Sequence, residues 1–166
     1  MSWNFNRHGY LEPGLHVLDI SEIDGHFVAS FPHSTTRKTI LDGYQNHSKD
    51  LLAVLGECEE YLDGSFVTSK NDPGDIDFVV LADPDKIDAL APDKKLKLKA
   101  LVSGPLTKTA YSCDAYFCPV YPVGHALHDM ARQQRKYWLG EFGYDRLDVP
   151  KGIVHVTLSS AKTTAT

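Results

Sequence analysis

Residues 64–78 read GSFVTSKNDPGDIDF, and the end of this stretch opens a run, DIDFVVLAD, that is rich in β-branched and aromatic residues. Such a run predicts a β-strand. Alternate side chains of a strand share one face of the sheet. We therefore expect Asp75 and Asp77 to point the same way, while Ile76 and Phe78 point into the core.

Two carboxylates on one face of a strand repel each other unless a cation lies between them. Mg²⁺ binds carboxylate oxygens and usually keeps waters or substrate phosphates as its other ligands. Asp75 and Asp77 are therefore candidate metal ligands. Two exposed residues on the polar face of a half-buried strand would give the same spacing, so this spacing alone leaves both interpretations open.

The dipeptide Gly64-Ser65 precedes these acids and reads as a turn between a strand and a helix. Such a turn can bring backbone N–H groups and a hydroxyl to a phosphate. Asp75 and Asp77 follow Ser65 by ten and twelve residues. The whole segment then predicts a phosphate cradle, a connector and a metal-binding strand. Lys70, in the connector, either neutralises phosphate charge or is a solvated loop lysine.

A third acid, Asp114, stands in the apolar and aromatic segment SCDAYF. Asp is uncommon within strands, so its presence there favours a functional explanation. An Asp at a strand end, with its carboxylate bonded to backbone N–H groups, is the alternative.

The remaining pattern predicts one α/β (α+β) domain over residues 1–166, a small mixed sheet with flanking helices. Residues 1–33 are expected to form an irregular N-terminal extension with short extended pieces and a brief helix capped by Ser21, and residues 160–166 a flexible tail. Helices are predicted from about 34 to 55 and 125 to 140, and further strands over 109–122 and 152–158. In the second helix, Leu127, Met130, Ala131 and Trp138 are expected on the inner side.

The composition excludes some classes of function. The formal net charge is −5, whereas proteins that bind the phosphate backbone of a nucleic acid are usually basic. Three cysteines without CxxC spacing, no apolar leader and no apolar run long enough to span a membrane together indicate a cytoplasmic protein with no membrane contact. The run Lys94, Lys95, Lys97 and Lys99 is a local basic patch or a solvated helix face.

The pattern Gly64-Ser65 followed by Asp75-Ile76-Asp77-Phe78 resembles the signature of the nucleotidyltransferase superfamily, which has the polymerase-β-like fold. The segments LEPGLH, GEFGYDR and PKGIV extend the resemblance over most of the chain, to a family of short bacterial nucleotidyltransferase-like proteins.

The resemblance implies a minimal nucleotidyltransferase with a nucleoside triphosphate as substrate and Mg²⁺ or Mn²⁺ as cofactor. Asp75, Asp77 and Asp114 would be the catalytic and metal-binding residues, and Gly64, Ser65 and Lys70 the nucleotide-binding ones. The superfamily usually has an apolar residue before the Gly-Ser turn. Asp63 stands there in this chain, which would make the approach of a phosphate less favourable.

The resemblance also suggests the acceptor and the setting. Small relatives often act beside a partner protein encoded nearby, and some transfer AMP to that partner in toxin–antitoxin or phage-defence systems; RNA is the other acceptor class. The alternative function is a catalytically silent, antitoxin-like module that binds a nucleotide or a partner on the same fold.

Several residues near the last strand have two interpretations. Trp138, Phe142 and Tyr144 would stack on a base or form an aromatic cluster of the core. Arg146 and Lys151 would reach a phosphate or an acceptor, or lie at a surface turn.

Overall fold

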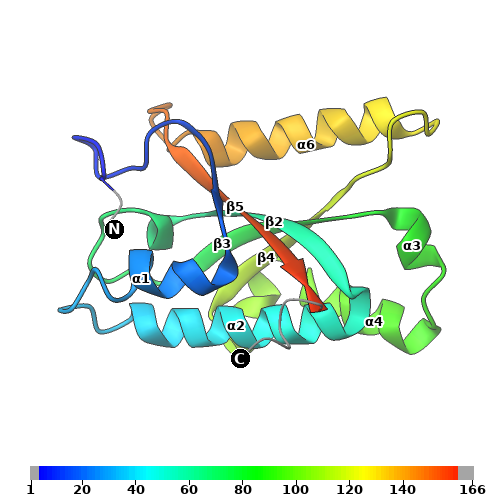
Figure 1. The fold of residues 1–166 in the computed structure, drawn as a ribbon, viewed down its shortest axis with the longest axis horizontal. Helices are drawn as coiled ribbons and strands as arrows, with labels where there is room; N and C mark the ends of the chain where they lie inside the picture. The colour runs from blue at the N-terminus through cyan, green and yellow to red at the C-terminus, as the bar shows by residue number, and fades with distance from the viewer. Residues whose placement is uncertain (1–3, 161–166) are drawn as a thin grey trace.

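A five-stranded mixed sheet forms the centre of the protein in the computed structural model, which describes residues 4–160 (Figure 1). The strands lie in the order β1-β5-β2-β3-β4. Their bounds are β1 Gly14–Leu18, β2 Glu57–Asp63, β3 Ile76–Ala82, β4 Cys113–Pro119 and β5 Gly152–Ser159. β2 pairs antiparallel with β5 and β3, whereas β1–β5 and β3–β4 are parallel pairs. The predicted α/β class with a small mixed sheet is confirmed.

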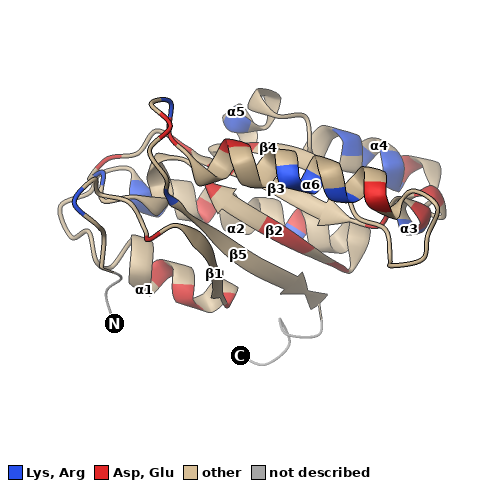
Figure 2. Cartoon of the chain, turned by 90° about the horizontal axis from the view of Figure 1, so that it is seen from above, with Lys and Arg blue, Asp and Glu red and all other residues tan. Residues whose placement is uncertain are grey.

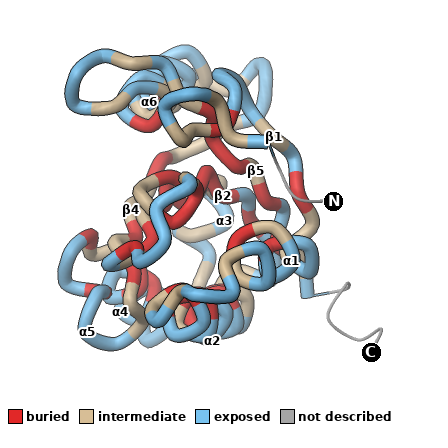
Figure 3. The backbone as a smooth tube through the Cα atoms, turned by 90° about the vertical axis from the view of Figure 1, so that its left-hand side faces the viewer, coloured by how far each residue is buried: buried red, intermediate tan, exposed pale blue. Residues whose placement is uncertain are grey.

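Helices cover both faces of this sheet (Figures 1 and 3). One face carries α1, α2, α4 and α5, and the other carries α6 alone. The α-helices are α1 Ile23–Phe27, α2 Arg37–Leu55, α3 Pro84–Asp88, α4 Pro92–Leu101, α5 Lys108–Tyr111 and α6 His128–Gly143. Three short 3₁₀ helices complete the fold: η1 Ile20–Glu22, η2 Ser65–Val67 and η3 Pro105–Thr107. Within residues 4–160, no helix is long and apolar enough to cross a membrane.

The alternation of side chains along β3 separates two clusters of apolar residues. Ile76, Phe78 and Val80 are buried in the larger cluster, under α2. Val79 belongs to a smaller cluster that includes Phe142 of α6. The same alternation places Asp77 on the α6 face of the sheet. The predicted division between core residues and acids in this strand is therefore confirmed for Asp77, and Asp75 lies one residue before the strand begins.

Several predicted boundaries were wrong. The N-terminal segment is not a mere extension, because β1 is an edge strand of the sheet, parallel to β5. Asp19, rather than Ser21, caps the first helical turn. Residues 161–166, most of the predicted tail, lie outside the described residues.

The two predicted elements that flank the site also differ from expectation. The strand predicted from residue 109 begins at Cys113, because α5 extends to Tyr111 and is capped by Ser112, which has a left-handed φ of 55°. Leu127, which precedes α6, and Met130 within it are 41% and 48% exposed, so the predicted inner side was wrong for both, whereas Ala131 is buried. The helix also starts later, at His128.

The connector between η2 and β3 is fixed by Arg37, which is fully buried at the start of α2. Its guanidinium donates hydrogen bonds of 2.6–2.8 Å to the carbonyl oxygens of Phe27, Phe66, Thr68 and Lys70. The same group lies 3.7 Å from the ring centroid of Phe31. A single side chain therefore holds the backbone of the predicted phosphate-binding segment against α2.

We predict that Arg37→Met lowers the free energy of unfolding by more than about 3 kcal/mol, because four carbonyl oxygens lose their donor in a buried site. Urea denaturation measures this loss. Lys38→Met is the matched control: Lys38 is the next residue on α2 and forms an exposed ion pair with Asp42, so its loss should cost less than about 0.5 kcal/mol. Equal stability of the two variants would contradict the role given to Arg37.

Candidate active site

Three aspartates meet across three adjacent strands of the sheet. Asp77 of β3 is directly opposite Asp114 of the parallel strand β4 and opposite Asp63 of the antiparallel strand β2. Neighbouring strands lie about 4.8 Å apart, so side chains at paired positions on one face are close. The predicted convergence of Asp77 and Asp114 is therefore present in the register of the sheet.

Gly64 has a structural role beside the Asp77 carboxylate. Its φ is 79°, a left-handed conformation that favours glycine. A Cβ atom at this position would collide with Asp77 Oδ2. The turn between β2 and η2 thus needs glycine to leave room for the acid, whether or not its backbone also contacts a phosphate.

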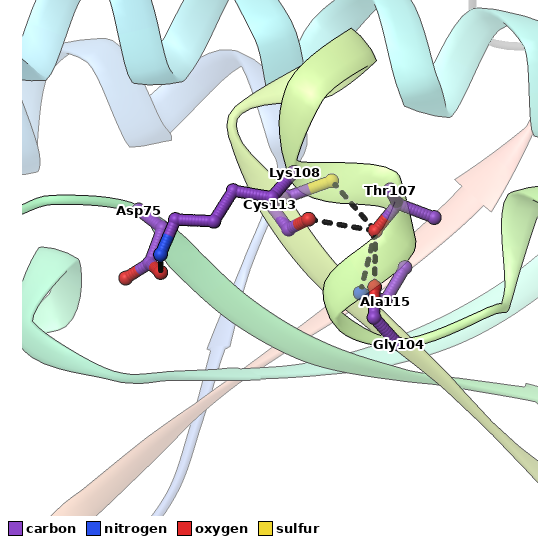
Figure 4. Close-up of polar contacts among 6 residues, drawn as sticks. All are labelled: Asp75, Gly104, Thr107, Lys108, Cys113 and Ala115. Atoms are coloured by element: carbon purple, nitrogen blue, oxygen red, sulfur yellow. Dashed lines mark hydrogen bonds and ion pairs between the residues drawn. The ribbon is translucent and has the colours of Figure 1, made fainter.

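Asp75 forms an ion pair with Lys108, with 2.5 Å between Oδ2 and Nζ (Figure 4). The hydrogen bond and the charge of Asp75 raise the pKa of Lys108 most. The charges of Asp114 and Asp77 raise it as well. This lysine was not predicted as a site residue, because it lies on a separate short helix and no sequence spacing links it to Asp75.

Thr107 anchors this part of the site to β4 (Figure 4). Its buried hydroxyl lies 2.6 Å from the carbonyl oxygen of Cys113 and accepts a 3.1 Å hydrogen bond from the N–H of Ala115. Those two residues flank Asp114 in the chain, so one side chain fixes the backbone on both sides of the third acid. Thr107 also precedes Lys108, and it therefore positions the start of α5 as well.

The acids that face α6 have perturbed pKa values. Burial, together with the charges of Asp75, Asp114 and Asp63, raises the pKa of Asp77 to about 6, and the charge of Lys151 opposes this. Burial and the charge of Asp75 also raise the pKa of Asp114, and Lys108 opposes this. Titratable groups perturbed in this way by burial and by each other are typical of functional sites.

Asp63, the departure from the superfamily pattern, is buried and paired with Lys151, 2.5 Å from Nζ to Oδ1. Burial raises the pKa of Asp63, and Lys151 and the Gly64 N–H lower it. Lys151 therefore compensates the negative charge of Asp63 within the protein. Of the two interpretations of Lys151, the solvated surface turn does not fit, because its side chain is only 11% exposed and is paired with Asp63. Whether it also reaches a phosphate or an acceptor stays a prediction.

A cavity with a volume of about 940 Å³ opens beside these residues, between the sheet, α6 and the N-terminal segment. Five of the six predicted site residues line it: Gly64, Ser65, Lys70, Asp75 and Asp77. Asp114 does not line the cavity, although its strand partner Asp77 does. Arg146, Trp138, Phe142 and Tyr144 are also in the wall. The site thus combines acids, cations and aromatic rings around one opening.

The carboxylate oxygens of these aspartates are chemically suited to bind a divalent cation. Asp114 Oδ1 is buried and accepts no hydrogen bond from the described residues, and the pKa of Asp77 is raised by burial and by the neighbouring carboxylates. Carboxylate oxygens of this kind are the preferred ligands of Mg²⁺. However, within residues 4–160, no three His, Cys, Asp or Glu side chains form a ready-made metal-binding group. Asp75 would have to exchange Lys108 for the ion.

The other predictions on charge and cysteines can be compared directly with the structure. Cys58, Cys113 and Cys118 are all buried and free, as expected for core residues. Figure 2 shows the lysines of α4 together on that helix, away from the acids on the strands. One of these lysines, Lys97, forms an ion pair with Asp50, with 3.5 Å between Nζ and Oδ1.

A family model described as "Family of unknown function (DUF6932)" matches residues 3–157. The chain belongs to this family. No protein with a curated description and no solved structure shows a significant match.

The raised pKa of Asp77 predicts a pH dependence of stability. An acid whose pKa is higher in the folded state than its ordinary 3.8 stabilises the fold when protonated, and this contribution is lost as the pH rises through about 6. In metal-free buffer, Asp77→Asn should therefore be more stable than the wild type at pH 8, by up to about 3 kcal/mol, and the difference should shrink toward pH 4.

Thermal or urea unfolding from pH 4 to pH 8 measures this effect. Asp88→Asn is the matched control, because Asp88 is exposed on α3 at the opposite end of β3. A pH-independent difference between Asp77→Asn and the wild type would contradict the raised pKa that burial and the neighbouring acids give Asp77.

Proposed function

We propose that this protein is a metal-dependent nucleotidyltransferase, which transfers a nucleoside monophosphate from a nucleoside triphosphate to a hydroxyl of a protein or RNA acceptor. The observation that carries the proposal is the in-register pair Asp77–Asp114, with Gly64 packed against the Asp77 carboxylate at the edge of a large cavity. The resemblance of residues 64–78 to the superfamily signature points to the same reaction.

The reaction forms a bond between the acceptor oxygen and the α-phosphorus, breaks the bond from that phosphorus to the bridging oxygen, and releases pyrophosphate and the hydroxyl proton. Bound Mg²⁺ or Mn²⁺ would neutralise phosphate charge and lower the pKa of the acceptor hydroxyl. Asp77, Asp114 and Asp75 are the residues that would hold the ions. Lys70 and Arg146 are exposed at the cavity wall, where they can bind phosphate oxygens.

Ser65 contributes a hydroxyl at the cavity wall, next to the glycine that touches Asp77. Its position suits a hydrogen bond to a phosphate oxygen. Arg37 supports this segment from behind, because it holds the carbonyl oxygens of Phe66, Thr68 and Lys70. The backbone that would face the triphosphate is therefore preorganised, and preorganised donors are the main source of transition-state stabilisation in phosphoryl transfer.

One observation favours the alternative, a silent binding module. Lys108 already neutralises Asp75, so a bound cation has to displace an ammonium group. A protein that never binds the metal would keep this ion pair. The resemblance further suggests a protein acceptor encoded nearby, in a toxin–antitoxin or phage-defence system, or an RNA acceptor, and the composition suggests that the reaction takes place in the cytoplasm.

We predict that the wild type transfers label from at least one α-³²P-labelled nucleoside triphosphate to a component of a cell lysate in the presence of Mg²⁺ or Mn²⁺. Asp77→Ala should abolish transfer, because the remaining acids cannot hold the metal in one geometry. Ser65→Ala should reduce it by roughly a hundred- to a thousandfold, the contribution of one preorganised hydrogen-bond donor, without abolishing it.

Asp88→Ala is the control for the loss of an acid, and it should transfer label like the wild type. Gel electrophoresis followed by nuclease or protease treatment identifies the acceptor class. A wild type that binds nucleotide but labels nothing with any nucleotide or either ion would refute the enzyme and support the binding module.

A further inference from the structure

One wall of the cavity is aromatic. Tyr116 of β4 and Tyr137, Trp138 and Phe142 of α6 all line it. The ring centroids of Tyr116 and Trp138 are 5.0 Å apart, and those of Trp138 and Phe142 are 5.3 Å apart. Rings packed in this way form a continuous surface rather than isolated side chains.

This aromatic wall begins beside the acids. Tyr116 lies two residues after Asp114, so the two side chains share a face of β4 and are about 7 Å apart along the strand. The Tyr116 ring therefore lies next to the position where a triphosphate would contact the acids.

The rings are held in place and remain accessible. A Cβ on Gly104 would come within 3.0 Å of Tyr116 Cε1, so the backbone supports that ring from behind. Trp138 is only partly buried, and Tyr137 is 60% exposed. An aromatic cluster that served only as core would be expected to bury these rings more fully.

We infer that the aromatic wall formed by Tyr116, Trp138 and Tyr137 is the subsite for the nucleobase of the nucleoside triphosphate. The inference rests on the proposed function and adds the residues that bind the base. Stacking on aromatic side chains contributes about 1–3 kcal/mol per base and tolerates any base, since every base has a π-face. The subsite therefore accepts purines and pyrimidines with modest discrimination, and α6 supplies the base contact within a single sheet-and-helix unit.

Calorimetric titration tests this inference directly. Non-hydrolysable analogues of ATP and CTP, each with Mg²⁺, are compared with tripolyphosphate, which offers the same charge without a base. The wild type should bind the analogues at least tenfold more tightly than tripolyphosphate. Trp138→Leu should remove this difference and leave tripolyphosphate affinity unchanged, whereas Trp138→Phe should keep most of it.

Two further readouts separate stacking from a structural effect. The sequence contains two tryptophans, Trp3 and Trp138, so Trp3→Phe makes Trp138 the sole reporter, and its fluorescence should be quenched by the analogues but not by tripolyphosphate. Tyr121→Leu is the control, because Tyr121 stacks on His125 and does not line this cavity. It should change neither affinity.

Equal affinity for the analogues and tripolyphosphate would overturn the inference, as would a Trp138→Leu variant that weakens both alike. If label transfer occurs without an affinity difference, the subsite is wrong and the proposed function stands. If the difference is present and depends on Trp138 but no transfer occurs, the subsite is supported and the enzyme is not. Failure to bind any of the three compounds would overturn both.

Discussion

The electrostatic repulsion among aspartates that share one face of the sheet is the constraint on which the rest of the site depends. Asp63, Asp77 and Asp114 occupy paired positions on β2, β3 and β4, where their charges cannot separate without moving the strands. The fold compensates two of the carboxylates in the cluster with lysines, Asp63 with Lys151 and Asp75 with Lys108. Within residues 4–160, Asp77 forms no ion pair with a lysine, and burial together with the neighbouring carboxylates raises its pKa. A carboxylate left uncompensated at the edge of a cavity is costly for a structural residue and useful for one that binds a cation.

Two positioning groups keep this arrangement rigid. Arg37 ties the connector that carries Lys70 to α2, and Thr107 ties β4 on either side of Asp114 to the turn before α5. Both act through backbone groups far apart in the chain, and neither lines the cavity. Together they place the acids of the sheet and the turn at Gly64 in fixed relation. The aromatic wall of α6 then closes the opposite side of the same opening, so acids, cations and rings surround one space.

Local periodicity predicted the part of the site that lies within a single segment. The alternation in DIDFVVLAD separated Asp77 from Phe78, and the Gly-Ser pair located the turn. The pairing of Asp77 with Asp114 was inferred from the resemblance. The two residues are 37 positions apart, and the local sequence of neither strand determines the register between them. Lys108, Lys151 and Arg37 were missed as partners because their contacts depend on tertiary placement. The inner face of α6 was mispredicted because this helix covers the sheet alone, and part of it borders a cavity instead of a packed core.

Anomalous diffraction from crystals grown with Mn²⁺ and a non-hydrolysable nucleoside triphosphate tests the central claim most directly, because manganese scatters anomalously and marks its own position. If the aspartates form a cation site, the anomalous map will show a peak in contact with the Asp77 and Asp114 carboxylates, and Lys108 will have left Asp75. Nucleotide bound in the cavity with no peak at these carboxylates, and with Lys108 still paired to Asp75, would contradict the account.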